Sequence, residues 1–213
     1  MPALGTLQGW TLTYLGTTAA DKAYPTATLN MVLNNAANAL YSDIDESNPS
    51  WFETVATLTS LSVTQHDYNL PSDFSKWKEV RLDDKNGSQL TEVRSDELNA
   101  TGGYAFAITG SDAAAVLTTG DTISAGNPLY LKYRQWPHVL ASVSDTPDMI
   151  PSQYHDVIAL MAAEEAMGLG GEGALPGTLV SRRIDRHAQL VMHVARRGTE
   201  IMSTRGSAFS QQD

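Results

Sequence analysis

The spacing of apolar residues changes twice along this chain, and these changes constrain its fold more than any other feature. Residues 1–47 and 147–213 are two zones of helical character, and from residue 26 in the first zone the apolar residues recur at the intervals of three and four that place them on one side of a helix. The intervening segment, about 50–146, alternates over short runs separated by glycines, as β-strands do. This order of helical and strand patterns predicts an α+β fold.

The clearest helix of the first zone spans residues 26–44. The apolar residues on its predicted buried face are Leu29, Leu33, Ala36, Leu40 and Ile44. Pro25 and Thr26 suit the start of this helix, and Asn48-Pro49 ends it. Residues 1–25 are rich in Gly and Thr, and no element is predicted there.

The dipeptide Asn86-Gly87 is the strongest local signal of the middle zone. Asn-Gly favours the tight turns that join two antiparallel strands. It separates residues 77–82 from residues 89–93, so we predict a β-hairpin at this place. Further strands are predicted within residues 54–63, 104–109 and 129–135.

The last zone contains two predicted helices separated by a glycine-rich loop. The first begins near Pro151, and the second spans about residues 178–203. The apolar arc of the second helix consists of Val180, Ile184, Val191, Val194, Ala195 and Met202. Its opposite side carries Arg182, Arg186, Gln189, His193, Arg196 and Glu200. We expect the apolar side to face the core and the arginine side to face solvent or a partner.

The formal net charge of -10 is distributed unevenly. The last fifth of the chain, from Glu172, contains six arginines and four acidic residues, so the acidity is concentrated before it. This acidity disfavours a protein that grips nucleic-acid phosphates over its whole surface. The N-terminus lacks the features of a signal peptide, and no apolar run is long enough to cross a membrane, so we expect no membrane association.

No group of residues has the spacing of a catalytic or metal site. The chain contains no cysteine, which excludes thiolate ligands and a cysteine nucleophile. His187 and His193 are six residues apart on one predicted helix and face different ways. Neither the G-x-S-x-G motif of hydrolases nor a phosphate-binding glycine loop is present. We therefore predict no catalytic residue, no metal and no cofactor, and a protein that is not an enzyme.

Three segments of the chain carry a family resemblance when they are taken in order. Residues 29–37 read LNMVLNNAA, and residues 67–74 read DYNLPSDF and precede the predicted hairpin. Residues 130–134 read YLKYR, and residues 148–154 read DMIPSQY and precede an alanine-rich helix. Together these segments resemble the head-to-tail adaptor (connector) family of tailed phages, which includes the podovirus tail-tubular A proteins.

The resemblance implies a helical bundle formed by an N-terminal helix and two C-terminal helices, with an inserted antiparallel β-lobe. The bundle would take residues 1–49 and 147–213, and the lobe would take residues 50–146. The implied function is that of a structural virion protein in the phage neck, assembled in the host cytoplasm. A ring of twelve copies would join the portal protein to the tail or nozzle protein. DNA would pass through the central channel without specific binding, and an acidic channel suits this passage because it repels the duplex.

Two surfaces are expected to meet partners. The last helix and the segment after it would dock on the portal through Arg182, Arg186, His193, Arg196, Arg197, Arg205 and Phe209. The predicted turn with Asp83, Asp84, Lys85 and Asn86 would face the tail. The alternatives are another neck or tail-completion ring protein, and a β-type ligand-binding module.

Overall fold

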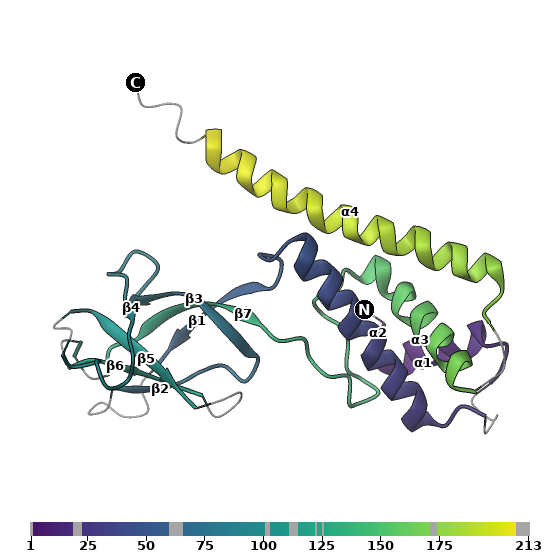
Figure 1. Cartoon of the computed structure of the whole chain (residues 1–213), viewed down its shortest axis with the longest axis horizontal. Helices are drawn as coiled ribbons and strands as arrows, with labels where there is room; N and C mark the ends of the chain where they lie inside the picture. Colours follow the sequence, from purple (N-terminus) through teal and green to yellow (C-terminus); the bar gives the residue numbers. More distant parts are fainter. Residues whose placement is uncertain are drawn as a thin grey trace. The chain divides into compact units, whose positions relative to one another are not determined.

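The structure is a computed structural model of the 213-residue chain. It describes residues 2–18, 23–59, 66–100, 103–110, 115–121, 123–124, 126–170 and 174–207, with side chains up to residue 197. The fold is α+β, as predicted. The chain separates into a helical unit, residues 1–51 and 137–213, and a β unit, residues 52–136 (Figure 1).

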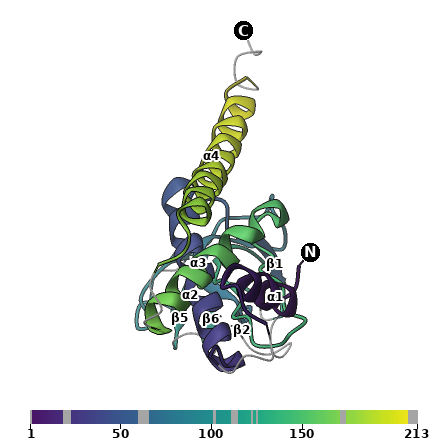
Figure 2. The same ribbon diagram turned by 90° about the vertical axis from the view of Figure 1, so that its right-hand side faces the viewer.

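The helical unit is built around one apolar helix, α3 (His155–Gly170). Its elements are α1 (Leu4–Tyr14), α2 (Thr26–Ser47), the 3-10 turn η2 (Ser152–Tyr154), α3 (His155–Gly170) and α4 (Gly177–Ser207). The buried side of α3 is rich in alanine, which lets neighbouring helices approach closely. Helices α1 and α2 pack against α3, and α4 lies along α2 and α3 (Figure 2).

The N-terminal helix α1 is absent from the sequence prediction. Its segment contains glycines and threonines, which have low helix propensity and obscure the apolar spacing. The helix nevertheless buries Leu4, Leu7 and Leu12. The hydroxyl of Thr11 donates to the Leu7 carbonyl at 2.9 Å, which satisfies this buried polar group. Tertiary packing therefore stabilises a helix that local propensity disfavours, and the bundle gains a second helix at its N-terminal end.

Residues 137–150 return the chain to the helical unit without forming a helix. The side chain of Asn34 in α2 holds this segment by bonding both backbone polar groups of one residue, Leu140. Its amide donates to the carbonyl of Leu140 at 3.0 Å, and its oxygen accepts from the N–H of Leu140 at 2.9 Å. Leu140 is buried, and the N–H of Leu4 donates to the carbonyl of Asp145 at 2.7 Å. These bonds compensate for the secondary structure that the segment lacks.

The β unit consists of two small sheets. Its strands are β1 (Glu53–Leu58), β2 (Asp67–Asn69), β3 (Phe74–Leu82), β4 (Thr91–Glu92), β5 (Ala105–Thr109), β6 (Val116–Thr119) and β7 (Leu129–Gln135). One sheet has the strand order β1-β7-β3, and the other has the order β2-β6-β5-β4. Both contribute to one core, which includes Tyr68, Val80, Phe106, Leu117 and Leu131.

The predicted hairpin at Asn86-Gly87 forms only over its first residues. Arg81 and Gln89 make an antiparallel bridge, and the N–H of Leu90 donates to the Val80 carbonyl at 2.9 Å. The second arm then leaves β3 and becomes β4, which pairs with β5 in the other sheet. The β4–β5 pair is parallel, unlike the antiparallel lobe of the prediction. The connection through residues 93–104 is long enough for a parallel pairing.

Asp73, in the DYNLPSDF segment of residues 67–74, joins the end of β7 to the start of β3 by hydrogen bonds. Asp73 accepts hydrogen bonds from the Tyr133 hydroxyl at 2.9 Å and from the Gln135 side chain at 2.5 Å. Its carbonyl accepts from the N–H of Trp136 at 2.6 Å. Burial raises the pKa of Tyr133 to about 12, and Asp73 adds to this rise. The segment has a structural role at the edge of the β unit.

We predict that Asp73→Ala lowers the free energy of unfolding by about 1–3 kcal/mol, because it leaves the buried Tyr133 hydroxyl without its acceptor. Tyr133→Phe removes the hydroxyl together with its need for a partner, so its cost is expected to be smaller. Urea denaturation of both variants measures the difference. Equal stabilities of wild type and Asp73→Ala would contradict this role.

His155 links the stability of the helical unit to pH. The ring is fully buried at the start of α3, and its Nε2–H donates to the carbonyl of Ile150 at 2.7 Å. Burial lowers the pKa of His155, so the folded protein holds the ring neutral at neutral pH. The unfolded chain titrates near the ordinary value of about 6.5. Below that pH the His155 ring binds a proton in the unfolded state and stays neutral in the folded state. The free energy of unfolding therefore falls as the pH falls.

We predict that His155→Gln loses less stability than wild type when the pH is lowered from about 7.5 to about 5, through the usual titration range of histidine. The glutamine amide can still donate toward Ile150 but does not titrate. Urea denaturation at several pH values measures the two slopes. Parallel slopes would show that His155 is not responsible.

Candidate docking surface on the last helix

The helical unit consists of an acidic part and a basic helix, α4. The acidic part, which is the described residues of 2–51 and 137–170, is called the acidic body. In the described parts of residues 2–51 and 137–170 there is no Lys or Arg. The carboxylates of this body are Asp43, Asp45, Glu46, Asp145, Asp148, Asp156, Glu164 and Glu165. Helix α4 instead carries Arg182, Arg183, Arg186, Arg196, Arg197 and Arg205. Opposite charges therefore meet where the first half of α4 touches α3.

Asp156 is the centre of the contact between α3 and α4. It lies in the first turn of α3, where the helix dipole stabilises a carboxylate. Its Oδ1 accepts from Arg186 Nη2 at 3.0 Å, and its Oδ2 accepts from Arg186 Nε and Arg182 Nη2, each at 3.2 Å. Arg186 also donates to the carbonyl of Gln153. Bonding to Asp156 raises the pKa of Arg186, so the guanidinium stays charged.

Two further polar contacts follow along the same side of α4, one an ion pair and the other a hydrogen bond. Arg183 Nε lies 2.7 Å from Glu164 Oε2 of α3, and His187 Nε2 lies 2.8 Å from Asp43 Oδ2 of α2. Leu190 and Val194 lie on this side as well and are fully buried. The inner side of α4 is thus mixed, with ionic contacts in its first half and apolar contacts beyond them.

The predicted orientation of α4 is wrong in its first half. Ile184, which belongs to the predicted apolar arc, is 53% exposed. Arg186, from the predicted arginine side, instead faces Asp156 with its side chain 31% exposed. The physical reason is the acidic body. Its carboxylates bind Arg186 and His187, so the side of α4 that carries these polar residues packs inward, although hydrophobicity alone predicts that it faces solvent. The apolar stripe alone does not determine the rotation of the helix.

Aromatic rings cover the second half of the contact. The His193 ring lies 6.2 Å from Trp51 and 5.7 Å from Tyr154, measured between centroids. The guanidinium of Arg186 lies 5.2 Å from the Tyr154 ring, and that of Arg197 lies 5.7 Å from the Trp51 ring. Such cation–π contacts hold arginines in place while part of each guanidinium remains accessible.

An open hollow of about 410 Å³ lies beside these rings. It is lined by Tyr154, Gln189, Met192, His193, Arg196 and Arg197. No carboxylate is among these lining residues, and both arginines and Met192 are exposed. The hollow therefore presents hydrogen-bond donors, positive charge and one apolar side chain, which suits an acidic segment of a partner protein.

The residues predicted to dock on the portal separate into three groups. Arg182 and Arg186 bind Asp156, so their charges are largely used within the unit. His193, Arg196 and Arg197 come together at the hollow. Arg205 lies in α4 without a described side chain, and Phe209 lies outside the described residues.

The residues predicted to face the tail lie together on an exposed turn after β3. Asp83 has a positive φ of 63°, and the Asp84 carboxylate accepts from the N–H of Asn86 at 2.7 Å. A Cβ at Gly87 would lie 1.6 Å from the Leu82 carbonyl oxygen, so only glycine fits there. Asp83, Asp84, Lys85 and Asn86 are all exposed.

Two negative findings apply to the part of the chain that the structure describes. No group of three or more His, Cys, Asp or Glu residues is placed to hold a metal ion there. Among the same residues, no helix has the length and apolar character needed to cross a membrane.

We predict that the Asp156–Arg186 pair couples α3 to α4 with an interaction energy of about 1 kcal/mol, measured by a double-mutant cycle of Asp156→Ala and Arg186→Ala in urea denaturation. The matched control is the pair Arg94–Asp96, whose side chains are 77% and 66% exposed. Solvent screens that pair, so its coupling should be near zero. Equal coupling in both cycles would contradict the central position of Asp156.

Comparison with known proteins identifies the family of the chain. No curated protein matches the chain significantly. The family model described as SU10 adaptor protein matches residues 4–191, which include the whole β unit and helices α1 to α3. The match ends within α4, after Arg182 and Arg186 and before His193. Since the match covers most of the chain, the protein belongs to the SU10 adaptor family, a family of phage head-to-tail adaptors with a structural role in the virion.

Proposed function

We propose that this adaptor forms a ring in the phage neck that joins the portal to the tail. Family membership makes it a virion component that interacts with other head and tail components. A ring of twelve copies, formed by head-to-tail contacts that close by rotation, is the arrangement we propose for it. Assembly would take place in the host cytoplasm, and binding energy at the subunit contacts would replace any chemical step.

The observation that carries this proposal is the division of α4 into a fixed half and a presented half. The first half is bound to the acidic body through Asp156, Glu164 and Asp43. The second half presents Arg196 and Arg197 beside the hollow. A helix that is anchored at one end and exposes cations at the other is suited to extend from one protein onto another. We assign this presented half, together with Arg205 and Phe209, to the portal.

The tail side is assigned to the turn at Asp83–Asn86, in the β unit. Its four side chains are exposed, and its backbone is fixed by Asp84 and by the close approach at Gly87. A rigid, charged turn of this kind can recognise a partner without an ordering cost. The helical unit (residues 1–51 and 137–213) and the β unit (residues 52–136) would then face different partners.

DNA would pass through the ring without specific binding. The chain has a formal net charge of -10, and a negative channel wall repels the duplex and prevents it from sticking.

Two other functions remain as alternatives with different expected results. Another neck or tail-completion protein would form a ring with six copies in place of twelve. A β-type ligand-binding module would use exposed aromatic residues. Tyr68, Phe106 and Tyr133 of the β unit are buried in its core. Among the described residues of this unit, only Tyr104 and Trp136, which are 44% and 57% exposed, offer exposed rings to such a ligand.

We predict that Arg196→Glu/Arg197→Glu weakens co-assembly with purified portal protein by about tenfold or more, because it reverses the charge of the presented half of α4. Lys85→Glu, in the turn, should leave portal binding unchanged and reduce tail joining. Sedimentation with portal and reconstitution of tail joining measure the two effects. Loss of both activities in both variants, or of neither, would contradict the assignment of the two surfaces.

A further inference from the structure

The outer face of the β1-β7-β3 sheet gathers basic residues in an acidic protein. Residues that are paired directly across neighbouring strands project from the same face of a sheet. Arg134 is paired with Glu53 and Lys76, Lys132 is paired with Val55 and Glu79, and Tyr130 is paired with Thr57 and Arg81. The other face, with Leu129, Leu131 and Tyr133, is buried in the core.

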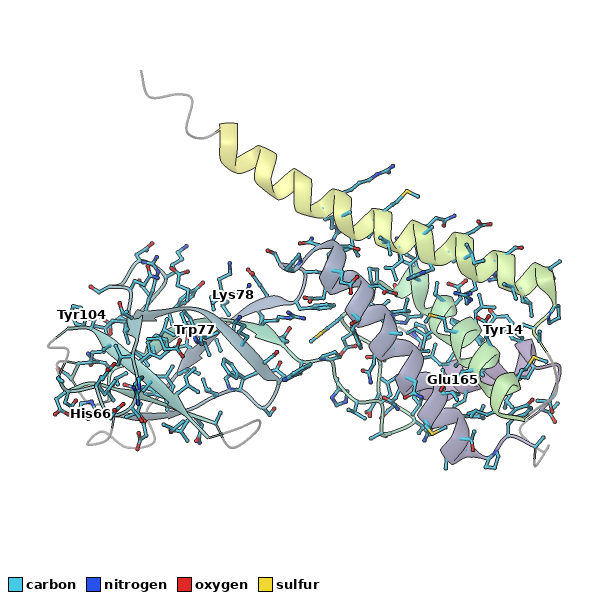
Figure 3. The ribbon with its side chains drawn as sticks, in the orientation of Figure 1. Tyr14, His66, Trp77, Lys78, Tyr104 and Glu165 are labelled. Carbon is cyan, nitrogen blue, oxygen red and sulfur yellow. The ribbon has the colours of Figure 1, made fainter. Side chains whose placement is uncertain are left out.

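Five of the fourteen Lys and Arg residues of the chain lie on this outer face. They are Lys76, Lys78, Arg81, Lys132 and Arg134. Lys78 lies at the bulge of β3, and its Nζ is 3.7 Å from the carboxylate of Glu53. Figure 3 shows Lys78 at the outside of the β unit, while the ring of Trp77 lies toward its interior. Five cations against Glu53 and Glu79 leave the face positive.

The remaining residues of this face favour a protein partner over DNA. Glu53 lies between two lysines, 2.7 Å from Lys132 and 3.7 Å from Lys78. A phosphate backbone lying across the face would meet this carboxylate and Glu79. Val55 is 53% exposed beside the cations, and Tyr130 is half-buried next to it. Apolar and basic side chains side by side are typical of a protein interface.

The acidic body of the helical unit has the complementary charge. Its described residues carry carboxylates and no Lys or Arg, and the contacts with α4 given above involve Asp43, Asp156 and Glu164. The last turn of α2 contains Asp45 and Glu46 and no basic residue. The C-terminal end of a helix already carries partial negative charge, and carboxylates there make the potential more negative. A cationic partner is therefore stabilised at this end. Glu46 is exposed.

We propose that the outer face of the β1-β7-β3 sheet of one copy docks on the acidic helical unit of a second copy, around the C-terminal end of α2. This contact joins two different surfaces, so it is head-to-tail and can propagate around a ring. It rests on the proposed ring function and names the surfaces that would make it.

The test uses single cysteines, because the chain has none of its own. Full-length Lys78→Cys and Glu46→Cys chains, with tags of different mass, are mixed with purified portal and oxidised mildly. The expected disulfide joins Lys78→Cys to Glu46→Cys. Its yield should exceed the yield of either same-site pair by about tenfold, the ratio that about 1.4 kcal/mol of preference produces. The yield should fall as salt screens the contact.

Two matched controls use residues of the same charge away from the proposed contact. Lys85→Cys, on the turn of the β unit, replaces Lys78→Cys, and Asp185→Cys, on α4, replaces Glu46→Cys. A second pair of variants adds a charge reversal to the Lys78→Cys chain. Lys76→Glu should lower the yield of the disulfide with Glu46→Cys by about tenfold, whereas Lys85→Glu should leave this yield unchanged.

Electron microscopy of the same mixtures separates this contact from the proposed function. Rings that form without the expected disulfide, or with equal yields in the controls, overturn the contact and leave the ring function standing. The absence of rings overturns both. Rings together with the selective disulfide support the contact.

Discussion

The Asp156–Arg186 contact is the interaction on which the rest of the helical unit depends. Among the described residues of this unit, helices α1 to α3 and their connections supply negative charge but no Lys or Arg, and every described Arg lies in α4. The attraction between the two fixes the rotation of α4 and turns Ile184 outward. As a result, Arg182 and Arg186 bind Asp156 within the unit, whereas Arg197 lies beside the hollow. The same electrostatic attraction thus shapes the packing of α4 and the candidate docking surface.

The β unit depends on shorter-range constraints. Asp73 fastens the ends of two strands of one sheet, and Gly87 permits the close turn after which the chain changes sheets. The same small unit also carries the basic face of the β1-β7-β3 sheet. The turn suits contact with the tail, and the face suits contact with another copy. A structural adaptor needs several such surfaces, and it needs no buried reactive group.

Segments with strong periodicity were predictable from sequence, and segments shaped by tertiary contacts were not. Helix α2 begins at Thr26 as predicted, and β7 has the predicted bounds Leu129–Gln135. Helix α1 could not be predicted because its stability comes from packing, which its Gly and Thr residues conceal. At the candidate site, the grouping of His193 with Arg197 follows from helical spacing. The inward position of Arg186 does not, since it requires knowledge that Asp156 lies opposite.

The central claim is that this protein is a ring-forming adaptor between portal and tail. Electron microscopy of the purified protein, alone and mixed with purified portal, tests it most directly. The account predicts a ring bound to one face of the portal, with twelve copies around a central channel. A protein that stays monomeric in the presence of portal, or forms rings that never bind it, would contradict the account.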